Sequence, residues 1–177
     1  MENQSTVKST ASSYGLTLGV VLTVFLILLY AFSLEMLTKW WIRLFEFAAV
    51  LIIAIMAMAK SKKKCDSLFT YKNSFTAYFL VVLIGLLIYH IVSYVLFNFI
   101  DPEAAQYVLE KAMEMSRSMM ESFGAPQDQI DKAIEEMGKQ NQFSLKNQAI
   151  GFAFSLAFYS VIGLLIALIF REKETTH

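Results

Sequence analysis

Residues 73–100 read NSFTAYFLVVLIGLLIYHIVSYVLFNFI and contain no Asp, Glu, Lys or Arg. A helix of about 20 apolar residues is long enough to cross the hydrocarbon core of a bilayer, so we expect this stretch to span a membrane. Three further runs without those four residue types lie at residues 9–34, 47–59 and 147–170. The chain, which is 56% hydrophobic, is therefore predicted to be an all-α integral membrane protein with four transmembrane helices.

The second run is too short to span a membrane by itself. As a helix, residues 47–59 would extend over only about 20 Å, against a hydrocarbon core of about 30 Å. A helix that starts near Trp40 reaches spanning length and places Trp40 and Trp41 at an interface, where indole rings concentrate. Such a helix also brings Arg43 and Glu46 into the span, where the carboxylate needs a partner, neutralisation or water.

Basic residues predict the orientation of the spans. Lys and Arg near helix ends prefer the cytoplasmic side, and five lysines lie around the turn between the second and third spans: Lys60, Lys62, Lys63, Lys64 and Lys72. Four spans then place both termini in the cytoplasm, in agreement with Lys8, Arg171 and Lys173. The segment between the third and fourth spans falls outside, and its acidic residues outnumber its basic ones by nine to five.

These observations predict the organisation of the whole chain. The first apolar run is too long for the core of a signal peptide, so we expect it to be retained as a helix. The predicted parts are a cytoplasmic N-terminal tail at 1–13, the first three transmembrane helices within 14–100 with a lysine-rich cytoplasmic loop at 60–73, an extracytoplasmic amphipathic helical insert at 101–145, the fourth transmembrane helix at 146–170, and a cytoplasmic tail at 171–177.

The insert has the pattern of a helical hairpin. Asp101-Pro102-Glu103 reads as an N-cap, a proline at the first helical position and an acid in the first turn. Gly124-Ala125-Pro126 is a typical stop followed by a restart, and the second helix should end near Gly138. Apolar residues recur at helical spacing along one face of each helix, as expected of two helices that pack together or lie on a membrane surface.

The insert also carries the candidate partner surface. Five of the nine methionines lie in it, and methionine is adaptable apolar filler at binding surfaces. The residues of this surface are Met113, Met115, Met119, Met120 and Phe123. Thioethers also bind cuprous copper, but no Cys or His supports such a site, because His90 lies in the third span and His177 ends the chain. We expect no metal site and no other cofactor.

A second candidate site is a cluster of polar residues inside the membrane. Ionisable groups at membrane depth are costly and often functional, and counting from the helix ends places five polar residues in the outer half of the bilayer: Arg43, Glu46, His90, Tyr94 and Asn98. Tyr30 and Gln148 fall near the same level. Two interpretations remain open. The cluster is either a structural clamp between helices, with His90 bonded to a hydroxyl such as Tyr30 or Ser155, or a site for protons or cations.

Small residues predict where the helices approach each other. Gly15 and Gly19 form a pair four residues apart in the first span. Four more small residues follow one edge of the last span: Gly151, Ser155, Gly163 and Ala167. Small side chains let helix backbones come close inside a membrane, so we expect both edges to face other helices.

The order of these features resembles a bacterial inner-membrane family, domain of unknown function 4199. The resemblance rests on Tyr14-Gly15-Leu16 at the first helix, Ser74-Phe75 after the lysine-rich turn, Asp101-Pro102-Glu103 at the end of the third helix, and Phe170-Arg171 at the end of the fourth. It runs nearly end to end. The resemblance implies four spans and a place in the inner membrane of a Gram-negative envelope, and it implies no catalytic residue.

These patterns favour a non-enzymatic accessory or scaffold subunit that docks a partner in an envelope assembly through its insert. The alternative is a small homo-oligomeric proton- or cation-linked transporter or channel that uses Glu46 and His90. An enzyme acting on lipids would need an acid, a base and a nucleophile near a headgroup, and only part of such a set is present. Balanced charge, 15 basic against 15 acidic residues, argues against nucleic acid as a partner. The possible partners that remain are membrane lipid, another membrane protein and a second copy of the chain.

Overall fold

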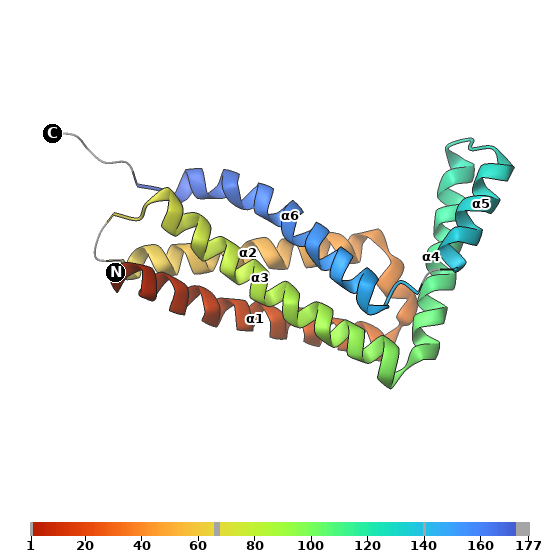
Figure 1. Ribbon diagram of the computed structural model, residues 1–177, viewed down its shortest axis with the longest axis horizontal. Coiled ribbons are helices and arrows are strands. Elements are labelled where there is room, and N and C mark those ends of the chain that lie inside the picture. Colours follow the sequence, from red (N-terminus) through yellow and green to blue (C-terminus); the bar gives the residue numbers. More distant parts are fainter. Residues whose placement is uncertain (1, 66–67, 140, 173–177) are drawn as a thin grey trace.

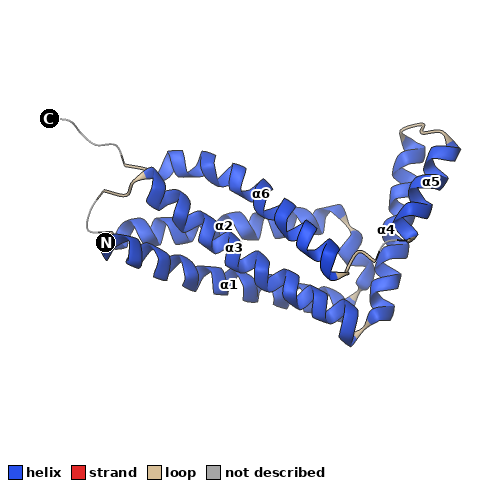
Figure 2. Cartoon of the chain, in the orientation of Figure 1, coloured by secondary structure: helices blue, strands red, loops and turns tan. Residues whose placement is uncertain are grey.

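The computed structural model describes residues 2–65, 68–139 and 141–172, so Lys173 and His177 lie outside the described part. Helices dominate that part, and no strand occurs in it (Figure 2). In chain order the elements are α1 (Glu2–Phe32), the 3-10 turn η1 (Leu34–Thr38), α2 (Trp40–Lys64), α3 (Tyr71–Val95), the π-helical turn η2 (Leu96–Ile100), α4 (Pro102–Ser122), α5 (Gln127–Gly138) and α6 (Leu145–Phe170).

Four helical segments are long and apolar enough to cross a membrane, namely α1, α2, α3 with η2, and α6. They run side by side with alternating direction, so the start of α1, the end of α2, the start of α3 and the end of α6 lie at one end of the bundle (Figure 1). The α4–α5 hairpin lies at the other end. The predictions of four spans and of a second span starting at Trp40 are confirmed, and the chain is a multi-pass membrane protein.

The first helix begins earlier than expected. Residues 1–13 were predicted to be a tail, but α1 is already helical at Glu2. Ser and Thr lower helix propensity only slightly, and no glycine or proline precedes Gly15. Val7 and Ala11 are buried in the same apolar cluster as Phe69. Packing against the bundle therefore extends the helix through this segment.

Helix α3 occupies the middle of the bundle and contacts α1, α2 and α6. It packs tightly on α1, where a Cβ atom on Gly85 would lie 2.5 Å from Cγ and Cδ2 of Leu18. Gly15 and Gly19 of α1 face isoleucines of α3 in the same way. On the other flank, Gly163 of α6 lies against the Tyr78 ring. The prediction that Gly15, Gly19 and Gly163 face other helices is confirmed.

The hairpin forms where the sequence predicts it. Asp101 caps α4, because its Oδ1 accepts a hydrogen bond from the Ala104 backbone amide at 2.9 Å. Gly124, with φ of 73°, supplies the left-handed residue that ends the helix. Arg117 on α4 and Asp131 on α5 form an ion pair at 3.1 Å. The hairpin crosses the end of the bundle and continues beyond α6 (Figure 1).

Candidate functional site

An ion pair in the first turns of α2 forms one wall of the candidate site. Arg43 Nη1 lies 3.0 Å from Glu46 Oε2, and the Glu46 side chain is only 14% exposed. Tyr89 of α3 donates a hydrogen bond from its hydroxyl to the other carboxylate oxygen, Oε1, at 3.4 Å. Both oxygens of this partly buried carboxylate are therefore engaged. Tyr89 was not predicted as a site residue, although it directly precedes His90 in the sequence.

His90 finds a different partner from those expected. Its Nδ1 lies 2.6 Å from Gln148 Oε1 of α6, and Gln148 donates from Nε2 to Ser93 Oγ at 3.4 Å. Because a carbonyl oxygen only accepts, Nδ1 carries the proton in this arrangement. The expected partners Tyr30 and Ser155 do not bond to His90 in the described structure. Gln148 thus links α6 to α3 through two polar contacts at membrane depth.

The ion pair and His90 line one cavity of about 500 Å³, which we call the α2–α6 cavity. Helices α2 and α6 both pack on α3, and the rings of Phe47 and Tyr159, 5.9 Å apart, bridge the space between them. The cavity has a polar part and an aromatic part. The polar part is lined by Arg43, Glu46, Tyr89, His90, Ser155 and Tyr159, and the aromatic part by Phe47, Phe154 and Phe158.

A second cavity, of about 370 Å³, lies on the hairpin side of the first. The two cavities share Arg43, Tyr89 and His90, so these side chains separate them. The second one is also lined by Gln142 and Phe143, which belong to the segment that returns from the hairpin to α6. A change at Arg43 would therefore alter both spaces at once.

Two residues of the predicted polar cluster lie away from the α2–α6 cavity. The Tyr94 ring packs edge-on against Phe99, with centroids 5.5 Å apart. Asn98, within the π-helical turn, donates from Nδ2 to the carbonyl oxygens of Tyr94 at 2.9 Å and Phe143 at 2.6 Å. Asn141 donates in turn to Asn98 Oδ1 at 3.4 Å. Asn98 thus fastens the returning segment to the end of α3.

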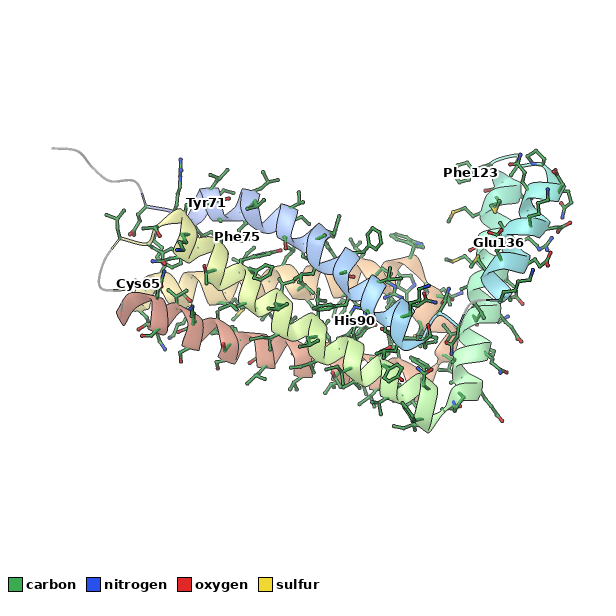
Figure 3. All side chains as sticks on the ribbon, in the orientation of Figure 1. Cys65, Tyr71, Phe75, His90, Phe123 and Glu136 are labelled. Carbon is green, nitrogen blue, oxygen red and sulfur yellow. The ribbon has the colours of Figure 1, made fainter. Side chains whose placement is uncertain are left out.

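The predicted partner surface divides into two groups. Met115, Met119 and Phe123 are exposed, by 42%, 53% and 84%, and they follow one another at four-residue steps. We call these three residues the α4 stripe. Figure 3 shows that Phe123 points from the hairpin tip toward the side on which the bundle lies. Met113 and Met120 are half-buried, and Met113 lies beside Gly138 of α5.

Helix α6 carries a second exposed surface, which was not predicted. Ala149, Ala153 and Ala157 are all exposed and lie four residues apart, on the flank away from the α2–α6 cavity. We call them the α6 alanines. Only 11% of the apolar stretch of α6 is buried inside the protein, against 28–33% for the apolar stretches of the other spans. The alanines repeat every four residues in the sequence. The glycine-containing edge of α6 shows the same spacing and packs on α3, so spacing alone does not tell which edge is exposed.

The described residues contain no group of three or more His, Cys, Asp or Glu side chains that could hold a metal ion. Neither a curated protein nor a solved structure matches the chain. The family described as "Protein of unknown function (DUF4199)" matches residues 13–172, which include most of the first span, the other three spans and the hairpin. The resemblance drawn from the sequence is confirmed, and the chain belongs to this family.

Proposed function

We propose that the protein is a non-enzymatic accessory subunit of an assembly in a Gram-negative bacterial envelope. In this proposal it lies in the inner membrane, with both termini in the cytoplasm and the hairpin outside. The lysines of the α2–α3 turn support that orientation, because they gather at the end of the bundle opposite the hairpin and basic residues favour the cytoplasmic side. The subunit would hold a membrane-embedded partner in the corner between α6 and the hairpin.

The main support for this proposal is that the hairpin extends beyond the bundle. With the four spans across the membrane, a hairpin that crosses the bundle end runs along the membrane surface and past α6 (Figure 1). The α4 stripe is exposed there, and Phe123 points toward the bundle side (Figure 3). Flexible thioethers adapt to the surface of a partner. A protein seated under the hairpin would cover side chains that the hairpin itself leaves exposed.

The α6 alanines supply the other side of the corner. Small side chains at four-residue spacing allow a second helix to approach closely within a membrane. Lipid can cover such a face equally well, so the alanines alone would not identify a partner. In this proposal one protein contacts both the α4 stripe and the α6 alanines. We infer a partner with a transmembrane helix against α6 and a short segment beneath α4.

Photo-cross-linking of the partner from two positions tests this proposal. A photoreactive residue is placed at Met119 or at Ala153 in the full chain, and cross-linked products from native membranes are identified by mass spectrometry. The matched control is Ile52, an exposed residue of α2 that would face lipid. We expect one and the same foreign protein from Met119 and Ala153 and none from Ile52. The proposal fails if the two positions capture different proteins, or nothing.

One observation favours the alternative function, a homo-oligomeric proton or cation transporter. Glu46 and His90 line the same cavity at membrane depth, as a proton relay would require. Against it, both oxygens of Glu46 are engaged by Arg43 and Tyr89, and no second acidic residue lines that cavity. Cross-links from Met119 and Ala153 to a second copy of the chain alone would favour this alternative.

A further inference from the structure

We propose that the α2–α6 cavity binds an uncharged membrane amphiphile whose small head carries hydroxyl or carbonyl oxygens. This site is separate from the corner that would hold a partner protein, because it lies on the opposite flank of α6. Its volume, about 500 Å³, falls in the range of small-molecule sites, roughly 300–1,000 Å³. The space would accept a lipid head and the first part of a tail.

Access to this cavity is from the bilayer. Phe154 and Phe158 of α6 line it and are 74% and 58% exposed. They lie within the membrane-spanning segment, so the surface that they expose faces lipid. Across the opening, α2 contributes Phe47, whose ring centroid lies 6.2 Å from that of Phe158. An apolar tail can therefore lie between aromatic side chains while the head reaches inward.

Unpartnered polar groups line the inner part of the cavity. Tyr159 is only 9% exposed, and its hydroxyl makes no hydrogen bond to the described part of the chain. Ser155 and His90 line the same space, and neither the Ser155 hydroxyl nor Nε2 of His90 has a hydrogen-bond partner among the described residues. A polar group withdrawn from water without a hydrogen bond costs about 1–3 kcal/mol. A head that both donates and accepts hydrogen bonds would satisfy all three groups.

The charges of the cavity favour an uncharged head. Its two ionised side chains, Arg43 and Glu46, already neutralise each other at 3.0 Å. Tyr89 engages the remaining carboxylate oxygen, so the Glu46 carboxylate has little capacity for a cation. A phosphate head would meet the Glu46 carboxylate, and an ammonium head would meet Arg43; like charges at short range repel strongly in a low-dielectric site. Hydroxyl and carbonyl oxygens avoid both penalties.

The test uses a diacylglycerol that carries a photoactivatable diazirine and an alkyne in one acyl chain. It is added to native membranes that contain the full-length chain, and labelled peptides are identified after irradiation. The reference probe is phosphatidic acid with the same acyl chains, which differs only in its charged head. We expect the diacylglycerol to label peptides of α2 and α6 around the cavity about tenfold more than the phosphatidic acid, and unlabelled diacylglycerol to compete.

A double variant tests whether the hydroxyls of Tyr159 and Ser155 contribute to binding. Tyr159→Phe with Ser155→Ala removes two hydroxyls but keeps the ring that stacks on Phe47. We expect labelling to fall roughly tenfold, as the loss of one or two net hydrogen bonds implies. The matched control, Tyr107→Phe, removes an exposed hydroxyl of the hairpin and should leave labelling unchanged. The elution profile in detergent shows whether each variant folds.

Several results would overturn the proposal. Equal labelling by both probes, absence of labelling, or labelled peptides spread over every lipid-facing helix would each show that the cavity does not select the head. Undiminished labelling of the folded double variant would show that its hydroxyls do not contribute. Should that variant fail to fold, competition on the unmodified chain decides: labelling that unlabelled diacylglycerol does not reduce contradicts a saturable site.

Discussion

The hydroxyl of Tyr30 donates a hydrogen bond to Asp101 Oδ2 at 2.8 Å, across 71 residues of sequence. The other oxygen of the same carboxylate caps α4 through the Ala104 amide at 2.9 Å. One side chain therefore starts the hairpin and attaches it to the last turns of α1. Since the hairpin would form one side of the corner for a partner, this carboxylate helps to set the geometry of that corner.

Acid should loosen this attachment. The backbone amide of Ala104, and then the Tyr30 hydroxyl, hold the pKa of Asp101 below its ordinary value of 3.8. A lowered pKa in the folded state means that the contribution to stability is complete above about pH 4 and is lost as the pH falls through the folded pKa. Spin labels are placed at Phe32 and Phe123, both exposed. We expect the distribution of distances between them to broaden as the pH falls through the folded-state pKa of Asp101.

The control for the acid response is Asp101→Asn. Asparagine caps a helix about as well as aspartate but does not titrate, so its spin-label distances should be the same at pH 6 and pH 3. A second variant, Tyr30→Phe, keeps the cap and removes only the bond to α1, and its distances should be broad at both pH values. An Asp101→Asn chain that responds to acid as strongly as the unmodified chain would contradict the assignment.

Removing the Asn98 side chain should release the segment that returns from the hairpin. Asn98→Ala deletes the bonds to the Tyr94 and Phe143 carbonyls and to Asn141. Orphaned or lost hydrogen bonds of this kind cost about 1–3 kcal/mol, so amide exchange at residues 141–147 should accelerate roughly tenfold or more. Hydrogen exchange with mass spectrometry measures this effect. Asn73→Ala, at the opposite end of α3, should leave these amides unchanged.

A methyl group at Gly85 should force α1 and α3 apart. The added Cβ would lie 2.5 Å from two atoms of Leu18, and overpacking of a tight interface costs about 1–3 kcal/mol. We expect Gly85→Ala to unfold at lower denaturant in a mixed-micelle titration. Gly151→Ala is the matched control, because its new Cβ would meet only His90 Cε1 at 3.6 Å, an ordinary contact. Equal losses from both changes would contradict the close-approach interpretation.

The sequence predicts the spans and the hairpin because each depends on neighbouring residues. A charge-free run defines a span, and the Asp101-Pro102-Glu103 cap together with the Gly124 stop defines the start of the hairpin and its turn. The early start of α1 at Glu2 was missed, since it depends on burial of Val7 and Ala11 against other helices. No local signal records that burial.

Side-chain pairings between spans could not be predicted for a related reason. A span that is apolar on all sides has little periodicity, so the sequence does not show which face turns toward which neighbour. His90 therefore reaches Gln148 where a hydroxyl was expected, and Tyr30 reaches Asp101. Arg43 and Glu46 were the exception, because three-residue spacing within one helix brings their side chains together.

Variants at Glu46 distinguish the accessory subunit, in which the ion pair is a structural clamp, from the proton or cation transporter. If the ion pair is a structural clamp, Arg43→Gln and Glu46→Gln should each lower the unfolding free energy. The double variant should then lose less than the sum of the two single losses, because residues that share a contact show coupling energies of about 0.5–3 kcal/mol. We expect this coupling, since Glu46 is 14% exposed and bonds to Tyr89 as well.

Proton uptake by proteoliposomes completes the comparison. Glutamine keeps the shape of Glu46 and its bond to the Tyr89 hydroxyl but cannot exchange a proton near neutral pH. A clamp predicts no uptake above that of empty liposomes, both for the unmodified chain and for Glu46→Gln. Uptake that disappears in Glu46→Gln while the unfolding free energy stays unchanged would contradict the clamp. It would assign Glu46 and His90 to transport, because a carboxylate retained for packing has no reason to gate the movement of protons.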